Sequence, residues 1–414
     1  MIVNSNDRLR VRRYVLALCL APIFGASSAG AQGNVSCADA ATQGAGGPDI
    51  TIGVNGGFTG PSASFSQGMK RGIEICTKEY NDAGGYKGRK VEMIYLDDQA
   101  KPEVAINNIS RFIQRDKVVG ILGPVNSGNA LAFLPKTEEA ETPVIVPIAS
   151  SVGIVYVDAD GKPVANSTAP GAKPRKYTFR TSMQDDFQIE TVLAYAKQAG
   201  WDAIGIMHDT SGYGSQAKAT AQRIIAGQGL KILATETYNV GDTDMTSQLQ
   251  KMKSAGVKQI INFGLAAELA GLLRSAQKID YKVQWAGPWG YADPAVGRLA
   301  GQELMEGVLA VASFTIDSSP AAADFHQKML KSFNENPFPM TAALGYDAAK
   351  LMLTALAKSG PDQVKLRDAI ETLEGFSGVS SIPSRPFSPT RHHSLDSNDM
   401  FVATWRNGDL VKAK

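Results

Sequence analysis

The sequence is poor in cysteine and histidine, with 3 and 4 of these among its 414 residues. So few thiols exclude a disulfide-dense scaffold, and no C-x-x-C or helically spaced histidine pair is available for a structural zinc site. Charge of one sign is also scarce, since 42 Lys and Arg face 40 Asp and Glu. The sequence contains no basic stripe of the kind that would predict nucleic-acid binding. We therefore expect a globular chain with no metal site and no nucleic-acid partner.

Long apolar runs are scarce as well. The N-terminal run from Tyr14 to Phe24 is about half of the roughly 20 apolar residues that span a bilayer, so we expect no stable membrane insertion. Arginines precede this run and Ala29-Gly30-Ala31 follows it, which is the order of a secretory signal peptide. We predict that residues 1–31 are a signal cleaved near Ala31 and that the remainder is periplasmic. Arg12-Arg13 leaves both the general and the twin-arginine export routes open.

Removing this signal would leave two cysteines, Cys37 and Cys76, in an oxidising compartment. An even pair favours one bridge, which would tie the N-terminal arm of residues 32–48 to the first helix. Closing a loop of about 40 residues would stabilise the fold by roughly 3 to 4 kcal/mol. Two separate thiols are the alternative.

From residue 49 onward, short apolar runs alternate with amphipathic stretches. Ile50 to Val54 predicts a buried strand, and apolar residues three and four apart between 68 and 81 predict a helix that stops before Gly84-Gly85. The pattern repeats as far as residue 286, which is typical of parallel sheets with right-handed crossovers. We predict an α/β fold with two Rossmann-like halves of about 130 residues each.

Two regions depart from this alternation. Residues 158–176, rich in Gly and Pro, predict a surface hairpin. Near the C-terminus, a strand at 401–405 precedes an Asn407-Gly408 turn and a returning strand. Late chain segments are thus expected to rejoin both halves. We predict lobe 1 from 49–181 plus about 313–362, and lobe 2 from 182–312 plus about 363–414.

No nucleotide or catalytic motif is present. The glycine-rich loop Gly56 to Gly60 fits neither a phosphate loop nor G-x-G-x-x-G, and the chain lacks a G-x-S-x-G elbow. The acidic pairs Asp97-Asp98, Asp185-Asp186 and Asp242 with Asp244 are explained by turns or helix caps. We therefore predict no cofactor and no enzymatic activity.

Two loops after predicted strands offer hydroxyl and backbone N–H groups. Gly123 to Gly128 follows one strand and opens a helix, and Ala149-Ser150-Ser151 follows the next strand. The carboxyl ends of parallel strands form the ligand crevice of such folds, and a helix N-terminus there suits a carboxylate. Plain helix caps without a ligand would give the same spacing, so the pattern alone leaves both interpretations open.

Motifs along residues 49–360 resemble those of the leucine/isoleucine/valine-binding proteins. They are Ile52 to Gly60, Asn81 to Gly85, Gly120 to Pro124, Val146 to Ser150, His208 to Thr210 and Gly345 to Ala349. Each motif is modest, but their order is specific. The resemblance implies a type I periplasmic solute-binding protein of an ABC importer, with two Rossmann-like lobes joined by a three-crossover hinge. It also implies a monomer that closes on a small-molecule ligand and docks with a membrane permease.

The resemblance further implies the roles of individual residues. Ser127, helped by the backbone N–H of Gly128, matches the group that holds the ligand carboxylate. Ala149 and Ser150 match a carbonyl and a hydroxyl that contact the ligand. The remaining matches are an aromatic residue of the first lobe that packs on the ligand, Phe65, and one that approaches from the second lobe, Tyr213.

One position departs from the family pattern. Amino-acid binders usually place an acidic residue after a second-lobe Gly-Pro step to pair with the ligand ammonium, whereas this chain has Trp289, followed by Tyr291. A buried ammonium without a carboxylate costs several kcal/mol, and indole and phenol surfaces suit an apolar body. We expect a small hydrophobic or aromatic carboxylate as ligand. The alternatives are a branched-chain or other amino acid, paired with another acid such as Glu268, and a soluble ligand-sensing receptor subunit.

Overall fold

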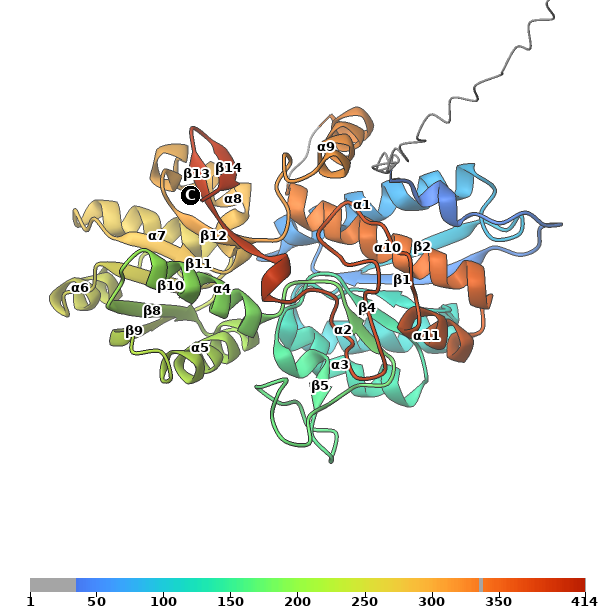
Figure 1. The fold of residues 1–414 in the computed structure, drawn as a ribbon, viewed down its shortest axis with the longest axis horizontal. Coiled ribbons are helices and arrows are strands. Elements are labelled where there is room, and N and C mark those ends of the chain that lie inside the picture. The colour runs from blue at the N-terminus through green and yellow to red at the C-terminus, as the bar shows by residue number, and fades with distance from the viewer. Residues whose placement is uncertain (1–34, 335–337, 414) are drawn as a thin grey trace, which may run out of the picture. The chain divides into compact units, whose positions relative to one another are not determined.

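The computed structural model describes residues 35–334 and 338–413 (Figure 1). The predicted signal, residues 1–31, lies outside the described residues. The described chain is an α/β fold with two main sheets, and none of its helices is long and apolar enough to cross a membrane.

The first sheet has five parallel strands in the order β2-β1-β3-β4-β7. Its strands are β1 Ile50–Gly56, β2 Val91–Asp97, β3 Ile121–Leu122, β4 Val144–Val146 and β7 Thr178–Arg180. The helices between them are α1 Ala63–Asp82, α2 Pro102–Arg111 and α3 Ser127–Glu139. The central strands β3 and β4 consist of buried apolar residues, as expected for a sheet covered on both faces, whereas the edge strand β2 is mostly half-buried.

The connection from β4 to β7 contains no α-helix and carries the region that interrupts the sequence pattern. Within it, β5 Tyr156–Val157 pairs antiparallel with β6 Lys173–Pro174. The predicted hairpin is therefore present, but it begins earlier than predicted, because its first strand precedes residue 158.

The second sheet has seven strands in the order β14-β13-β12-β11-β10-β8-β9. Five run parallel, and β13 and β14 join antiparallel at one edge as the predicted C-terminal hairpin. The strands are β8 Ala203–Asp209, β9 Lys231–Tyr238, β10 Gln259–Phe263, β11 Gln284–Gly287, β12 Leu309–Ala312, β13 Phe401–Arg406 and β14 Asp409–Lys412. The accompanying helices are α4 Asp185–Gln198, α5 Gly212–Ile225, α6 Thr246–Ser254, α7 Ala266–Lys278 and α8 Pro294–Ala300.

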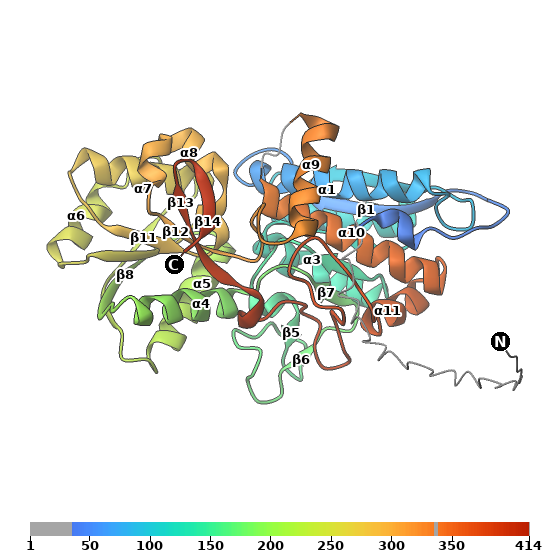
Figure 2. The same ribbon diagram turned by 45° about the horizontal axis from the view of Figure 1, so that its top comes forward.

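Three late helices return to the first sheet: α9 Pro320–Phe333, α10 Pro339–Ser359 and α11 Gln363–Glu371. Helix α10 lies along α1 in both ribbon views (Figures 1 and 2). The two helices can approach this closely only because glycines lie at the contact. A Cβ on Gly72 would lie 1.9 Å from the Ala342 carbonyl oxygen, and a Cβ on Gly345 would lie 2.3 Å from the Met69 carbonyl oxygen.

Residues 363–395 stay beside the first sheet. The backbone N–H of Arg180 donates to the His392 carbonyl at 2.8 Å, and the His392 ring stacks on Phe179 with centroids 4.2 Å apart. The chain next enters the second sheet at β13. The boundary predicted at about 363 is therefore too early for these contacts, and we propose that lobe 1 extends to about residue 395.

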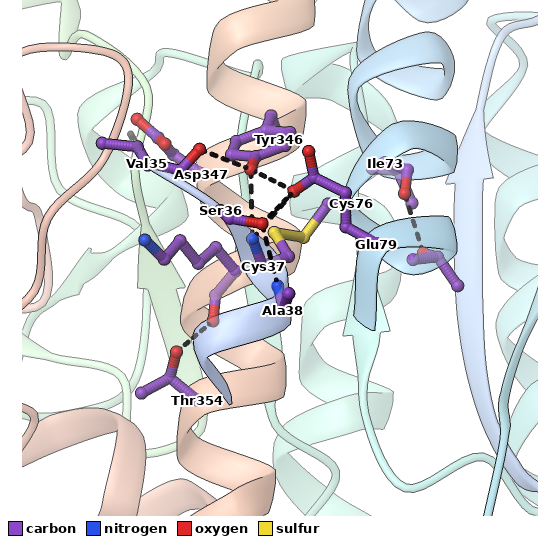
Figure 3. The surroundings of a disulfide bond; sticks show 12 residues. Val35, Ser36, Cys37, Ala38, Ile73, Cys76, Glu79, Tyr346, Asp347 and Thr354 are labelled. Atoms are coloured by element: carbon purple, nitrogen blue, oxygen red, sulfur yellow. Dashed lines mark hydrogen bonds between the residues drawn. A yellow bond between two sulfur atoms is a disulfide. The ribbon is translucent and has the colours of Figure 1, made fainter. Parts of the chain in front are cut away.

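The predicted bridge between Cys37 and Cys76 is present (Figure 3). Both cysteines are fully buried and their Cα atoms are 5.2 Å apart. Cys37 begins a short 3-10 turn, Cys37–Ala40, in the N-terminal arm, and Cys76 lies within α1. The bridge thus attaches the arm to the helix, as the sequence predicted.

Glu79, one turn beyond Cys76, completes this attachment. Its Oε2 accepts hydrogen bonds from the Ser36 hydroxyl at 3.0 Å, the Cys37 backbone N–H at 2.9 Å and the Tyr346 hydroxyl at 2.6 Å (Figure 3). Its Oε1 lies 3.1 Å from the Lys328 ammonium. The arm is therefore held by a covalent bond and by a fully paired polar cluster from α1, α9 and α10.

Candidate functional site

Loops from the carboxyl ends of strands in both sheets surround a small cavity of about 40 Å³. The cavity contains five of the eight residues predicted to bind ligand. Its lining consists of Phe65, Val125, Asn126, Ser127, Ile148, Ser150, Ser211, Tyr213, Gly264, Leu265, Trp289 and Gly290. This is the place where ligands bind in open α/β sheets.

The loop after β3 brings Ser127 to the cavity as the first residue of α3. Gly123 makes the turn possible, since its φ is +115° and a Cβ would lie 2.1 Å from the Asn55 carbonyl oxygen. The Ser62 hydroxyl donates to Asn126 Oδ1 at 2.9 Å and fixes this loop to the start of α1. Ser127 itself accepts only a long hydrogen bond, 3.4 Å, from the Ser151 backbone N–H.

The loop after β4 presents Ser150, and Arg180 supports it from the neighbouring strand. Arg180 is fully buried at the end of β7, and its Nη1 donates to the carbonyl oxygens of Ser150 at 3.1 Å and Ser151 at 2.7 Å. Burial lowers the pKa of Arg180 to about 10, so the side chain stays charged at neutral pH. One guanidinium therefore fixes two consecutive peptide groups of the loop.

The second sheet contributes the start of α5. The Ser211 hydroxyl caps this helix by accepting from the Gly214 N–H at 3.1 Å. Tyr213 lies in the first turn, and burial raises the pKa of its phenol well above the usual value, so it is a neutral hydrogen-bonding group. Helices α5 and α3 begin close together, because a Cβ on Gly212 would lie 3.3 Å from Gly128 Cα.

Trp289 supplies the aromatic wall. It is 4% exposed, and its backbone N–H donates to Gln188 Oε1 at 3.1 Å. Its ring meets Phe65 edge to face with centroids 5.4 Å apart, and Phe65 meets Phe338 in the same way at 4.9 Å. Trp289 therefore lines the cavity rather than facing solvent.

A hydrogen bond beside this wall joins α1 to the start of α8. The Ser64 hydroxyl donates to Asp293 Oδ1 at 2.8 Å, and the same oxygen caps α8 by accepting from the Ala295 N–H at 2.8 Å. Burial raises the pKa of Asp293 to about 6. The contact connects helices that pack on different sheets.

Charged side chains are absent from the described lining of the cavity. Helices α3, α5 and α7 all begin there, at Ser127, Gly212 and Ala266. The first N–H groups of a helix have no intrahelical partner and carry partial positive charge. The starts of these helices therefore direct partial positive charge toward the cavity.

Asp185 is a second group of interest near Ser150, and the sequence interpretation as a turn or helix cap missed it. Its backbone N–H donates to the Ser150 carbonyl at 3.0 Å, and its carboxylate lies beside the Ser150 and Ser151 hydroxyls without a well-formed hydrogen bond among the described residues. Burial raises its pKa to about 7, although those hydroxyls and the Arg180 charge oppose the shift. This carboxylate is fully buried and only weakly paired.

The acid considered as a substitute, Glu268, is also buried but does not line the cavity. Its Oε1 accepts from the Gly241 N–H at 2.6 Å, so it is directed toward the loop after β9. Burial raises its pKa. Asp185 does not line the cavity either, but it lies beside Ser150, which does.

Three predicted site residues lie outside the cavity lining. Gly128 follows Ser127 in α3. The Ala149 carbonyl accepts from the Ser182 hydroxyl at 2.9 Å. Tyr291 packs on Trp285 in the second half of the chain, with centroids 6.4 Å apart, and its carbonyl accepts from Trp405 Nε1 at 2.6 Å. Tyr291 is thus a core residue in this structure.

Two sheets whose strand ends meet at one shared cavity are the architecture of a solute-binding protein of the hinged, two-lobe class. The chain belongs to the periplasmic binding protein family, whose sequence profile matches residues 49–409, and within it to the type I, branched-chain amino acid group. The predicted fold and resemblance are confirmed. Its relatives are solute-binding proteins rather than enzymes, and the family is periplasmic and works with the permeases of ABC importers.

Individual relatives support the same conclusion. A Leu/Ile/Val-binding protein homolog 2 from Brucella abortus is 27% identical over 90% of this chain and 95% of its own length. A type 1 periplasmic binding protein from Bordetella pertussis superposes with a TM-score of 0.79 at 28% identity, covering 88% of this chain and all of that one. A Rhodopseudomonas palustris solute-binding protein in complex with 4-hydroxybenzoate shares the fold, with a TM-score of 0.73 at 21% identity over 88% of this chain and 96% of its own.

Proposed function

We propose that this protein captures a small carboxylate with a hydrophobic or aromatic body and delivers it to the permease of an ABC importer. The observation that carries the proposal is the convergence of three helix N-termini on a cavity without charged lining residues. Such a site stabilises a negative charge without a cationic side chain.

In this proposal, the two ends of the ligand meet different walls. The hydroxyls of Ser127 and Ser150 and the first N–H groups of α3 hold the carboxylate. Phe65, Trp289 and Tyr213 cover the body. Because the lining comes from both sheets, a bound ligand favours the closed arrangement of the hinge. The cavity is small, so the spacing of the Phe65 and Trp289 rings sets the size of the body that fits.

An amino acid is the second candidate, and Asp185 is the observation that favours it. Its buried carboxylate is only weakly paired and lies beside the Ser150 and Ser151 hydroxyls. An ammonium group placed between them would pair with Asp185 and lower its pKa from about 7. The relatives named for leucine, isoleucine and valine are consistent with this candidate.

The two candidates can be separated with matched ligand pairs that differ only in the ammonium group. We would compare 3-phenylpropanoate with phenylalanine, and 4-methylpentanoate with leucine, by thermal shift and calorimetry on the mature chain. A ligand at 100 times its Kd stabilises the folded state by about 2.7 kcal/mol, which is readily visible. Preference for the plain acids supports the proposal. Preference for the amino acids overturns it and favours the second candidate.

Proton linkage gives an independent readout. Near pH 7, an amino acid that pairs with Asp185 should release a proton, because it stabilises the charged carboxylate. A plain acid should release none, since a nearby second negative charge favours the protonated form. Calorimetry in two buffers of different ionisation enthalpy measures this difference.

A further inference from the structure

A second, larger cavity of about 380 Å³ lies outside the strand-end site. Aromatic and aliphatic side chains dominate its lining, among them Phe314, Ile316, Phe338, Met340, Trp405 and Leu410. Its volume falls within the range of small-molecule pockets, about 300 to 1,000 Å³.

The walls of this cavity come from both halves of the fold. Trp405, Leu410 and Val411 belong to the β13–β14 hairpin, which lies near α8 in Figures 1 and 2. Phe338 and Met340 lie at the start of α10, which packs on α1. The segment from Phe314 to Asp317 connects β12 to α9 and lies between them. The cavity is therefore built around a hinge connection.

The side chains that line this second cavity carry negative charge, whereas no charged side chain lines the first cavity. The lining contains two exposed carboxylates, Asp317 and Asp409, together with His326, and no Lys or Arg among the described residues. Asp317 and Asp409 would repel a carboxylate ligand here, whereas they would attract a cation. We propose that this cavity is a second binding site, for a small hydrophobic molecule that carries a protonated amine.

Three aromatic rings connect the two cavities. Phe338 lines the second cavity and meets Phe65 edge to face, and Phe65 meets Trp289 in the first cavity. The first cavity is small, so a larger ligand body would push Phe65 toward Phe338, and the second cavity offers Phe338 space to move. An amine that fills the second cavity removes this space and weakens carboxylate binding. This coupling rests on the proposed function, but the amine site itself does not.

Three probes of equal size test the site: cyclohexylmethylamine, cyclohexylmethanol and cyclohexanecarboxylate. Their affinities would be measured by calorimetry at pH 8 on the mature chain and on two variants. Val411→Trp fills the cavity from the half-exposed strand β14, and Leu233→Trp adds the same side chain at an exposed position on β9. Binding that is lost in the first variant and kept in the second belongs to this cavity.

We expect the amine to bind at least ten times more tightly than the alcohol, and Val411→Trp to weaken it at least tenfold while Leu233→Trp leaves it unchanged. Equal affinity for the alcohol, or amine binding that survives Val411→Trp, would overturn the proposal. Carboxylate binding that Ser127→Ala weakens is assigned to the first cavity. Amine binding should also survive Ser127→Ala, so failure of the strand-end site and failure of this site give different results.

The coupling has its own measurement. A saturating amine should raise the Kd of a carboxylate identified for the first cavity, and that carboxylate should raise the Kd of the amine by the same factor. Val411→Trp mimics the filled cavity, so it should weaken carboxylate binding without any amine. Unchanged carboxylate affinity in both experiments would overturn the coupling while leaving the amine site standing.

Discussion

Glu79 and Asp185 are two carboxylates with opposite surroundings. Glu79 accepts hydrogen bonds from the arm and from α10 and pairs with Lys328. Burial alone would raise its pKa, but Tyr346, Cys37 and Lys328 outweigh burial and lower it. Asp185 has weaker partners, the Ser150 and Ser151 hydroxyls, and burial outweighs them and raises its pKa to about 7. Buried polar groups are normally well paired, so the contrast separates a cluster that stabilises the fold from a carboxylate that gains little from its surroundings.

The largest expected effect concerns the stabilised region. Replacing Cys37 and Cys76 together by Ser should lower the free energy of unfolding by about 3 to 4 kcal/mol, because the unfolded chain loses its cross-link. Urea denaturation measures the loss. Ligand affinity should stay within twofold, since neither cysteine lines the cavity. A variant that is stable but binds poorly would contradict this separation of the two regions.

The next largest effect is expected on ligand affinity at the cavity that contains Ser127. Ser127→Ala should weaken carboxylate binding by about 1 to 3 kcal/mol, since one hydrogen bond to a charged group is lost. Calorimetry on the mature chain measures this change. Ser110→Ala is a matched control, because that hydroxyl bonds only to the Ile106 carbonyl of its own helix, at 2.8 Å. If the two variants bind the carboxylate with equal affinity, Ser127 does not contact the ligand.

Asp185 should change how the free energy of unfolding depends on pH. Its raised pKa means that the folded protein holds this proton more tightly than the unfolded chain, so its contribution to stability is lost as pH rises from about 4 to about 7. The Asp185→Asn variant has no titrating group at this position, so it should not lose this contribution to stability. The stability of the variant relative to wild type should therefore increase with pH across that window, as measured by urea titrations.

Asp186→Asn sharpens the same comparison. The neighbouring Asp186 is paired, since its Oδ1 accepts from Gln184 Nε2 at 2.7 Å and from the Phe187 N–H at 2.9 Å. Removing a well-paired carboxylate should destabilise the protein at pH 7, whereas removing the weakly paired one should not. Equal destabilisation by both variants would show that Asp185 is well paired after all.

The smallest effect is expected at the hydrogen bond between Ser64 and Asp293. Ser64→Ala should cost about 1 kcal/mol of ligand affinity, because only the closed arrangement gains this bond. The change should appear in the dissociation rate, measured by stopped flow. Unchanged dissociation would mean that the bond forms equally in the open arrangement.

Much of the fold follows from local patterns, while several elements depend on tertiary contacts. Alternating apolar runs and helical spacing predicted β1, β13 and most of α1 close to their observed bounds. The three-residue strand β7 and the polar helix α11 carry too little periodicity to be recognised. Residues 372–395 have no regular pattern, so their position beside the first sheet was not predicted.

The same distinction applies to the site. Ser127 and Ser150 were predictable because strand ends converge in parallel sheets. Asp185 was missed because its sequence position resembles a helix cap, and its weak pairing depends on which side chains surround it. Tyr291 was misplaced because side-chain direction within a short 3-10 turn cannot be derived from spacing alone.

Arg180 has a consequence for how the cargo of this protein can change. By holding the Ser150 and Ser151 carbonyls, it keeps this loop in place whatever occupies the aromatic side of the cavity. If the proposed function holds, substitutions at Phe65 or Trp289 would alter which acid is accepted while the contacts to the acid group persist. Diversification of cargo in such a protein requires few mutations, and engineering of a sensor for a new acid would begin at those two rings.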